Sequence, residues 1–418
     1  MILLELLPII ITFLFLIVIL SYYVLIFLKT KKPKKERSFS SITIIIPSHN
    51  EGRYIGECIE SVIAARFKGK KEIIVVDDGS RDNTIEIAKN YIGKIKLITK
   101  RHTGKSDSIN RAISLSKGEL IAVVDGDSFI HENSLQEIVK EIERENVAAA
   151  TGVIKVRNRK KFICMWMHIE QLYSSLMRHI FSKINANIVT PGPLSVYRKK
   201  ELLKVGKFGT KGYAEDVDVT IRLIKKGYKI RFTENAVSET NMPYDTRGFF
   251  LQRTRLARGL INILKRNLSL NTTIIDIYTL PLLLFNYVQA AIMGAFTIYQ
   301  LISGYITYFF SKGIYLDFQV LNFFFEWFSV IGFVKWTYRV IIGNTPLTFF
   351  TAIGIVSTLL TYPLYIYAIA KYDRKFDFWH LIPLFFMFPY WLLIMIIYIY
   401  CLPEYFRKKQ FNIWKKNE

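Results

Sequence analysis

With 418 residues, the chain is too long for one ordinary core, and 51% of its residues are hydrophobic, so at least two structural units are expected. The formal net charge of +23 comes without a recognised RNA- or DNA-binding motif, which excludes nucleic acid as the expected partner and favours anionic lipid headgroups. Cys58, Cys164 and Cys401 are scattered without metal-binding spacing, which excludes a disulfide framework and indicates packing residues in a reducing compartment.

The first predicted element is an apolar helix near the N-terminus. No charged residue occurs from 6 to 28, and about 22 residues at roughly 1.5 Å each reach about 33 Å, enough to cross the hydrocarbon layer of a bilayer. A cleaved signal peptide is the competing interpretation, but the sequence has no positive region before this stretch and no small-residue cleavage site after it. We therefore predict a transmembrane anchor over 1–30 and a juxtamembrane linker over 31–40, whose basic residues mark the cytoplasmic side.

Alternating strands and helices are predicted next. Short, nearly continuous apolar runs indicate buried strands, and helical patterns lie between them. The strands are expected at 42–46, 72–76, 96–99 and 119–124, and the helices at 55–64, 84–91 and 106–116. This alternation predicts an α/β domain with a parallel sheet, over residues 41–245.

Carboxylates follow two of these strands. Asp77 and Asp78 come at the end of the second, and Asp125 and Asp127 follow the fourth in an Asp-Gly-Asp sequence. Ligands of an open α/β sheet bind at the carboxyl ends of its strands, so both pairs are expected in one crevice. A nucleotide diphosphate bridged by a hard cation fits there. The competing interpretation of the Asp-Gly-Asp sequence is a turn that ends a strand.

Three further segments carry candidate functional residues. Gly192 stands between two prolines, a pattern that also suits a rigid turn. Glu215 and Asp216 open a helix-like stretch, where carboxylates also stabilise a helix N-terminus. The pattern at 248–264 is typical of an amphipathic helix on the membrane surface, within a predicted interface region at 246–272.

Apolar character returns in a predicted membrane region of three to four spans at 273–403. The candidate spans are 274–310, 318–342, 347–370 and 379–402. Glu326, Lys335 and Arg339 interrupt the second, which suits either an interfacial helix or a helix lining a protected path. The basic tail at 404–418 is expected in the cytoplasm, which requires an even number of spans after the domain. We predict four there and five overall.

Several motifs, in this order, resemble family 2 glycosyltransferases. They are Ile46-Pro47-Ser48-His49-Asn50-Glu51, Asp77-Asp78-Gly79-Ser80, His102-Thr103-Gly104-Lys105, Asp125-Gly126-Asp127, Ala214-Glu215-Asp216 and Gln252-Arg253-Thr254-Arg255. The similarity is greatest to the membrane-embedded branch of hyaluronan, chitin, cellulose and poly-N-acetylglucosamine synthases. It implies a GT-A-type, Rossmann-like nucleotide-sugar domain inserted between α-helical transmembrane segments.

The resemblance implies a metal-dependent donor site. Asp125 and Asp127 would hold Mg²⁺ or Mn²⁺ against the diphosphate of a nucleotide-sugar donor, because hard cations prefer carboxylate and phosphate oxygens. Asp78 would contact the uracil edge. His49 would stack on the base in place of the family's usual aromatic residue, and Glu51 would meet nearby polar groups.

The resemblance also assigns roles around the sugar. Lys105 and Arg255 would contact the diphosphate through charge-assisted bonds. Asp216 matches the general base of the family, which removes the acceptor proton during an inverting displacement. Leu256 replaces a tryptophan that resembles an acceptor platform, so the acceptor is expected to be held differently. The implied acceptor-binding residues are Gly192, Pro193, Glu215, Gln252 and Arg253.

The leading hypothesis is a multi-pass cell-membrane enzyme with a cytosolic catalytic domain. It would move a sugar from a UDP-linked donor to a growing β-linked polysaccharide, with export if the spans enclose a channel. The rival hypothesis, which Leu256 favours, is transfer of one sugar to a polyprenyl-phosphate or ceramide-like lipid, and product length separates the two. A non-enzymatic transport or scaffold protein is disfavoured because Asp127 and Asp216 are both present.

Overall fold

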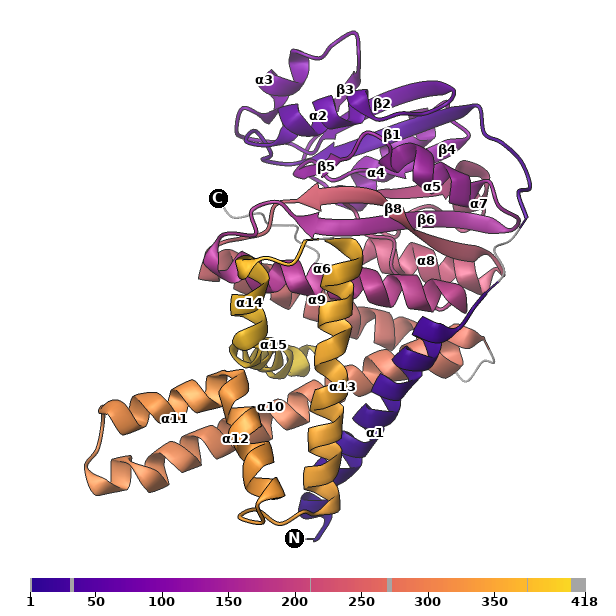
Figure 1. Cartoon of the computed structure of the whole chain (residues 1–418). Helices are drawn as coiled ribbons and strands as arrows, with labels where there is room; N and C mark the ends of the chain where they lie inside the picture. The colour runs from indigo at the N-terminus through magenta and orange to yellow at the C-terminus, as the bar shows by residue number, and fades with distance from the viewer. Residues whose placement is uncertain (1, 31–33, 211, 269–272, 374, 407–418) are drawn as a thin grey trace.

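The chain forms an α/β domain and a group of apolar helices. The computed structural model describes residues 2–30, 34–210, 212–268, 273–373 and 375–406; the linker residues 31–33 and the tail residues 407–418 lie outside these ranges. In Figure 1 the sheet of the domain lies above the apolar helices. Two helices, α6 (Phe162–Lys183) and α9 (Thr246–Asn267), lie between the sheet and the apolar group (Figure 1).

An eight-stranded sheet forms the centre of the domain, in the spatial order β3-β2-β1-β4-β7-β6-β8-β5. Its strands are β1 (Ser41–Ser48), β2 (Lys70–Asp77), β3 (Lys96–Thr99), β4 (Leu120–Val123), β5 (Ser128–Ile130), β6 (Val147–Val156), β7 (Ser195–Arg198) and β8 (Lys229–Thr240). The four predicted strands are β1 to β4, and they run parallel. The predicted α/β class is therefore confirmed.

The second half of the sheet is mixed, where the sequence predicted only parallel strands. Strand β7 runs antiparallel to both β4 and β6, with Val123 opposite Ser195. Because these strands run in opposite directions, the residues that follow β4 lie beside the residues that precede β7. This pairing brings Asp125 next to Gly192, whose carbonyl accepts a hydrogen bond from the Asp125 backbone N–H at 3.1 Å.

Helices cover both faces of the sheet. Those of the domain are α2 (Ile55–Ala64), α3 (Thr84–Lys89), α4 (Lys105–Leu115), α5 (Ser134–Ile142), α7 (Lys199–Lys204) and α8 (Glu215–Lys225), besides α6 and α9. On β1, Ile44 and Ile46 belong to a core shared with α2 and α5, whereas Ile45 belongs to a core shared with α4 and α8. Alternate side chains of a strand point to opposite faces, so this one strand serves both cores.

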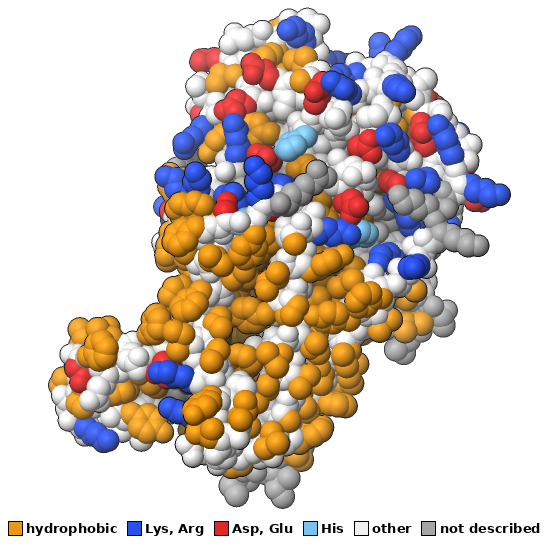
Figure 2. All heavy atoms as spheres, in the orientation of Figure 1, with side chains coloured by type: hydrophobic (Ala, Val, Ile, Leu, Met, Phe, Trp, Pro, Cys, Tyr) orange, Lys and Arg blue, Asp and Glu red, His pale blue; other side chains and the backbone are white. Residues whose placement is uncertain are grey.

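Four helices are long and apolar enough to cross a membrane, by length and composition: Leu6–Phe27, Ile275–Lys312, Phe349–Tyr372 and Met387–Tyr405. The apolar elements are α1 (Ile2–Phe27), η1 (Ile275–Thr279), α10 (Leu280–Tyr308), η2 (Phe310–Lys312), α11 (Phe318–Phe328), α12 (Val330–Ile341), α13 (Phe349–Tyr372), α14 (Phe378–Phe385), α15 (Met387–Cys401) and η3 (Leu402–Tyr405). Figure 2 shows hydrophobic side chains over this part and charged ones over the domain.

The segment predicted to span at 318–342 is divided into the hairpin α11–α12. The break is at Ser329, whose backbone is extended (φ −124°, ψ 164°). Gly332 permits the tight approach that follows, because a Cβ there would lie 2.1 Å from the carbonyl oxygen of Glu326. Each half is 11 or 12 residues long, which is too short to cross a bilayer. The described residues thus hold four helices of spanning length, one fewer than predicted.

Both ends of the segment α14–α15 are attached to the domain. At its start Asp377 pairs with Arg159 at 2.6 Å, and after its end Glu404 pairs with Arg258 of α9 at 2.8 Å. In Figure 1, α1 and α13 run from the domain to the opposite end of the molecule, whereas α15 lies across them, close to α9. The described end of the chain is therefore on the domain side, where the sequence placed the tail.

Candidate active site

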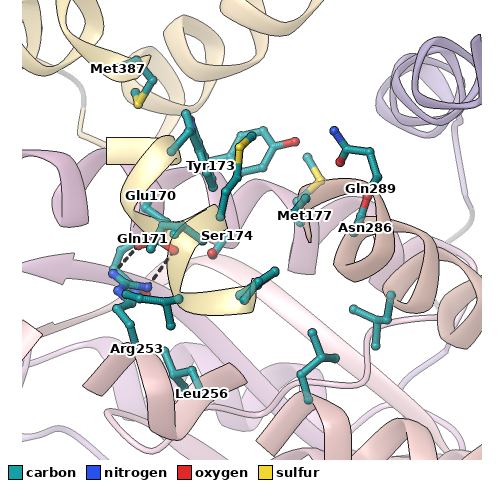
Figure 3. A pocket seen from close by; sticks show the side chains of 18 of the residues that line it. Glu170, Gln171, Tyr173, Ser174, Met177, Arg253, Leu256, Asn286, Gln289 and Met387 are labelled. Atoms are coloured by element: carbon teal, nitrogen blue, oxygen red, sulfur yellow. Dashed lines mark hydrogen bonds and ion pairs between the residues drawn. The ribbon is translucent and has the colours of Figure 1, made fainter. Parts of the chain in front are cut away.

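A cavity of about 2320 Å³ connects the domain with the apolar helices. The sequence-predicted residues that line it are Lys105, Asp125, Asp127, Gly192, Pro193, Glu215, Asp216, Gln252, Arg253 and Arg255. The rest of its wall includes side chains from α1, α6, α10, α11, α12, α13 and α15. Figure 3 shows part of this wall, with Arg253 and Leu256 on one side and Asn286 and Gln289 on the other.

Asp125 lies at the end of β4 and pairs with Lys105 at the start of α4. Lys105 Nζ is 2.5 Å from Asp125 Oδ1 and 3.7 Å from Glu215 Oε1. Although burial works against the charged amine, the carboxylates of Asp125 and Glu215 raise the pKa of Lys105 above its usual value. The ammonium is therefore fixed in its charged form beside the carboxylate.

Gly192 permits the close approach of β4 and β7 at this point. A Cβ on Gly192 would lie 2.2 Å from Oδ2 of Asp125. A Cβ there would displace the Asp125 carboxylate, so glycine leaves the space that this carboxylate occupies. The predicted glycine thus shapes the wall beside Asp125.

The residues around the Asp-Gly-Asp sequence fit a divalent cation. Asp127 Oδ1 lies 3.2 Å from the Ser128 hydroxyl and 3.5 Å from the Thr240 hydroxyl, so its neighbours are oxygens. Asp125 and Asp127 both line the cavity, and carboxylate oxygens are the donors that Mg²⁺ and Mn²⁺ accept. The donor set and the open wall are compatible with one such ion.

Asp216 lies in the first turn of α8, at the cavity wall. Ala214, two residues earlier at the N-cap, adopts a left-handed conformation (φ 68°, ψ 51°), which is unusual for a residue with a side chain. The Asp216 carboxylate accepts a hydrogen bond from the Val217 backbone N–H at 2.9 Å. Burial, together with the neighbouring charge of Glu215, raises the pKa of Asp216 from 3.8 to about 6. A carboxylate with this pKa is suited to accept a proton near neutral pH.

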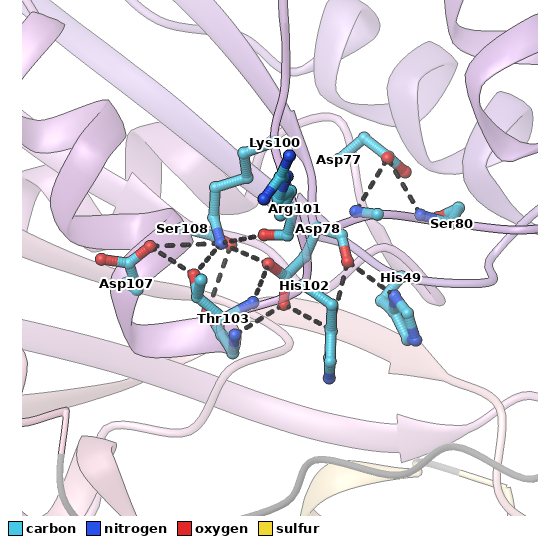
Figure 4. Close-up of polar contacts among 12 residues, drawn as sticks. His49, Asp77, Asp78, Ser80, Lys100, Arg101, His102, Thr103, Asp107 and Ser108 are labelled. Carbon is cyan, nitrogen blue, oxygen red and sulfur yellow. Dashed lines mark hydrogen bonds and ion pairs between the residues drawn. The ribbon is translucent and has the colours of Figure 1, made fainter.

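A second polar group lies at the ends of β2 and β3 (Figure 4) and reaches the cavity wall only through Thr103, Gly104 and Asp107. Its centre is the buried carboxylate of Asp78, which pairs with Lys100 and with His102, the latter at 2.9 Å. The same carboxylate accepts the backbone N–H groups of Thr103 at 2.9 Å and Gly104 at 2.8 Å. Asp78 therefore organises the loop that leads into Lys105, and a base that contacts it has to replace one of these partners.

His49 and Glu51 lie beside this group, on the loop after β1. The ring of His49 stacks on that of His102, with centroids 4.3 Å apart. Glu51 is buried, and its backbone N–H donates to the hydroxyl of Thr84 at 2.7 Å. Asp77 holds the turn by accepting the backbone N–H groups of Gly79 and Ser80. The sequence did not indicate the roles of Lys100 and His102, although His102 belongs to the quoted His-Thr-Gly-Lys motif and Lys100 stands two residues before it.

The Gln-Arg-Thr-Arg sequence lies on α9, beneath the site. Arg253 is buried and pairs through both terminal nitrogens with Glu170 of α6, and it also donates to the Tyr390 hydroxyl at 2.8 Å. Arg255 and Leu256 are exposed and line the cavity. Arg253 of α9 thus joins α6 and α15, whereas Arg255 lines the cavity.

A cluster of His168, Asp373 and His380 lies elsewhere, between β6, α6 and the loop after α13. The Nδ1 atoms of the two histidines accept backbone N–H groups, of Val156 at 3.2 Å and of Asp377 at 3.1 Å. The Nε2 atom of His168 then carries the proton that points to Asp373 at 3.1 Å, whereas Nε2 of His380 lies 3.0 Å from Asp373 and 3.2 Å from Nη1 of Arg159. Lys155 and Arg159 also pair with Asp373, so its carboxylate already has cationic partners, and these contacts favour a polar link between the domain and α13.

The fold and the site define a class. A mixed α/β sheet with carboxylates at its strand ends is a GT-A-type domain, and it is joined here to helices that are long and apolar enough to cross a membrane. The sequence profile of Glycosyl transferase family 2 matches residues 43–206, so this part of the chain is a family 2 glycosyltransferase domain.

Relatives of this domain bear related names. The poly-beta-1,6-N-acetyl-D-glucosamine synthase of Staphylococcus aureus (strain COL) is 27% identical over 233 residues, which cover 54% of this chain and 56% of the relative. The Bacillus subtilis (strain 168) protein named "Probable glycosyltransferase YdaM" is 29% identical over 237 residues, which cover 53% of this chain and 56% of that protein. The matched region therefore spans about half the length of these relatives.

A solved structure shares the fold of the whole chain. It is a mannosyltransferase from Pyrobaculum calidifontis in complex with GDP-Man and Mn²⁺. The TM-score is 0.60 at 16% sequence identity, and the superposition covers 98% of each chain. The shared fold thus includes the apolar helices as well as the domain.

Proposed function

We propose that this protein is an inverting, metal-dependent glycosyltransferase of the cell membrane, with its domain in the cytosol. Its donor is a nucleotide diphosphate sugar, UDP-linked, and its acceptor is a growing β-linked polysaccharide. The observation that supports this most is the convergence of Lys105, Asp125 and Asp216 on one cavity that continues among the apolar helices. The synthase named above, whose product is a β-linked N-acetylglucosamine polymer, suggests the sugar class.

Different residues of the site act on the acceptor and on the leaving group. The Asp216 carboxylate takes the proton of the acceptor hydroxyl while that oxygen forms a bond to the anomeric carbon. The bond from this carbon to the donor diphosphate breaks on the opposite side, so the configuration inverts. Lys105 and Arg255 stabilise the negative charge of the departing nucleoside diphosphate.

A divalent cation held by Asp125 and Asp127 would neutralise charge on the diphosphate. Asp78, His49 and Glu51 bind the base side of the donor. On the acceptor side, Gly192, Pro193, Glu215 and Gln252 shape the wall, while Arg253 fixes α9 against α6. These roles are the ones that the resemblance to family 2 implies, and each can be tested by substitution.

The experiment is a transfer assay with the purified full-length chain in lipid nanodiscs. It receives Mn²⁺ or Mg²⁺ and a panel of radiolabelled UDP- and GDP-sugars, and the labelled product is then sized. A polydisperse product of high mass is the expected result. A single labelled sugar that extracts with lipid would instead support transfer of one sugar to a lipid acceptor. No transfer from any donor would refute the proposal that the protein is a glycosyltransferase.

The second candidate is transfer of one sugar to a lipid acceptor. Two observations favour it: Leu256, 51% exposed, offers the cavity no aromatic platform, and the cavity continues along apolar side chains of α1 and α10. An acceptor with a lipid tail would bury that tail against such a wall.

A further inference from the structure

A chain of buried hydroxyl groups ends at the backbone carbonyl of Asp216. Its members are Tyr197 on β7, Thr190 before the turn between the two prolines, and Thr220 on α8, and all three are fully buried. The Thr220 hydroxyl lies 2.6 Å from the Asp216 carbonyl oxygen. The Thr190 hydroxyl lies 2.6 Å from that of Thr220 and 2.7 Å from that of Tyr197. Three separate segments therefore meet behind Asp216.

The hydrogen bonds of this chain run in one direction. The Thr220 hydroxyl donates to the Asp216 carbonyl, so its oxygen has to accept the proton of Thr190. Thr190 has then used its only proton and accepts the proton of Tyr197. Burial raises the pKa of Tyr197 above its usual value, so the phenol keeps that proton. Each hydroxyl thus donates once, and the bonds of such a chain strengthen one another.

The tyrosine end of the chain is held in the centre of the sheet. Tyr197 pairs with Ile121 of β4 on one side and with Ala149 of β6 on the other. Its ring packs edge-on against Phe208, with ring centroids 5.4 Å apart. The chain therefore connects Asp216 to a strand that is fixed by neighbours on both sides.

The carbonyl that receives the chain follows a strained residue. The left-handed backbone of Ala214 (φ 68°) costs free energy and persists only where the surrounding structure holds it. The Ala214 carbonyl accepts the Asp218 backbone N–H at 3.1 Å, which is a bond within α8. Thr220 also bonds within the helix, to the carbonyl four residues earlier, as threonines often do. Thr190 and Tyr197 belong to other segments, so they attach this strained turn to the sheet.

Thr190 also connects the proposed base with a proposed metal ligand. Two residues after Thr190, the Gly192 carbonyl accepts the Asp125 backbone N–H at 3.1 Å. One short segment, 190–192, therefore contacts the backbones of both Asp125 and Asp216. In an inverting displacement the acceptor and the leaving diphosphate lie on opposite sides of the anomeric carbon, so the distance between base and metal decides whether both can act at once.

We propose that Tyr197, Thr190 and Thr220 are positioning residues, which hold the Asp216 base at a fixed place relative to Asp125. This inference rests on the proposed function, because it assigns the three hydroxyls to the transfer step. None of the three residues lines the cavity, so they act through Asp216 and not on the substrate. Loss of a hydroxyl should therefore slow transfer and leave donor binding unchanged.

The test compares Thr220→Val with Thr220→Ser in the full-length chain in nanodiscs. Valine has nearly the same shape but no hydroxyl, whereas serine keeps the hydroxyl. The readouts are kcat with a saturating concentration of the nucleotide sugar that the unchanged protein transfers, and the Kd of UDP with Mn²⁺. We expect Thr220→Val to lower kcat about tenfold without changing the Kd, and Thr220→Ser to restore most of the rate. Normal kcat in Thr220→Val, or a parallel rise in Kd, would overturn the proposal.

A double variant separates an action through Asp216 from a general loss of structure. In an Asp216→Asn background the base is already absent, so Thr220→Val should lower the residual kcat less than about twofold. The same tenfold loss in both backgrounds would overturn positioning.

Thr43→Val is the matched control. Thr43 is a buried threonine near the start of β1, and its hydroxyl donates to Glu72 at 2.6 Å. Its loss should lower the unfolding temperature and leave kcat unchanged. A tenfold loss of kcat in this variant would mean that kcat reports general damage, which would overturn the proposal.

Tyr197→Phe tests the far end of the chain, also where Thr220→Val does not fold. It removes the hydroxyl but keeps the packing of the ring, and should lower kcat about threefold with normal UDP binding. Normal kcat in Tyr197→Phe would overturn the chain. No transfer by the unchanged protein would refute the proposed function and this inference together, whereas transfer by the unchanged protein with normal kcat in the variants would overturn this inference alone.

Discussion

Asp216 and Asp125 are both carboxylates at the cavity wall, but their neighbours prepare them for different tasks. Asp125 has Lys105 2.5 Å away, so its charge is already paired and can take part in holding a cation and a diphosphate. Burial and the negative charge of Glu215 raise the pKa of Asp216, and the hydrogen bond from the Val217 backbone N–H lowers it. The net effect favours a base.

The raised pKa of Asp216 predicts the pH dependence of transfer. Only the deprotonated carboxylate accepts a proton, so kcat/KM should be level above pH about 6 and fall about tenfold per unit below it. Asp216→Asn should lower kcat at least about 100-fold, abolish this acidic limb and retain donor binding. The measurement is a pH series of initial rates beside donor titrations. Full activity in the variant would remove Asp216 as the base.

The metal assignment predicts a loss of binding in Asp127→Ala. Without this carboxylate, the Kd of UDP measured with Mn²⁺ should rise by about tenfold or more and lose its dependence on the metal. Isothermal titration with and without Mn²⁺ measures both effects. Glu86→Gln, which changes an exposed carboxylate on α3, is the control and should bind UDP normally. Unchanged metal dependence in Asp127→Ala would contradict the assignment.

At the scale of elements, the domain is joined to the apolar helices through α6 and α9. Glu170 of α6, Arg253 of α9 and Tyr390 of α15 form one buried polar contact, and the rings around it belong to the apolar core. Arg159 forms a second link, to Asp373 and Asp377. Both contacts join segments that are distant in sequence. They therefore fix the domain relative to the apolar helices that line the cavity.

The buried pair predicts a large effect of one substitution on stability. Arg253→Met should lower the free energy of unfolding by about 3 kcal/mol, because it leaves the Glu170 charge buried and unpaired. The control is Arg66→Met, which removes an exposed pair with Glu132 and should cost less than about 1 kcal/mol. Thermal unfolding in nanodiscs compares the two. The double variant with Glu170→Met should recover part of the loss, and equal effects of both single variants would contradict the buried pair.

At the scale of the whole molecule, one hairpin, α11–α12, lies between the long helices α10 and α13 in the chain, and a second, α14–α15, follows α13. The helices α1, α10 and α13 extend from the domain toward the opposite end, while α11–α12 begins and ends there and α14–α15 begins and ends at the domain (Figure 1). Glu326 and Lys335, whose charges interrupted the predicted span, pair with each other across the first hairpin at 2.5 Å. Pairing lets these charges remain among apolar helices.

This arrangement predicts the sidedness of two loops. Ser311→Cys before α11 and Asn344→Cys after α12 should be labelled from the same side of a membrane vesicle by an impermeant maleimide. Glu86→Cys in the domain should be labelled from the other side. The background variant lacks the native cysteines, which are buried. Labelling of 311 and 344 from opposite sides would restore 318–342 as a span and the count of five.

The sequence by itself determined the α/β class, strands β1 to β4, the family 2 motifs and the apolar segments, because period, charge and chain order are local properties. Only the tertiary structure decided that β7 reverses direction, that 318–342 folds into a hairpin and that Arg253 pairs with Glu170, 83 residues away. It also decided that Tyr197, Thr190 and Thr220 form one chain of hydroxyl groups. The physical reason is that such features depend on which distant residues meet in space, and local patterns do not encode those contacts.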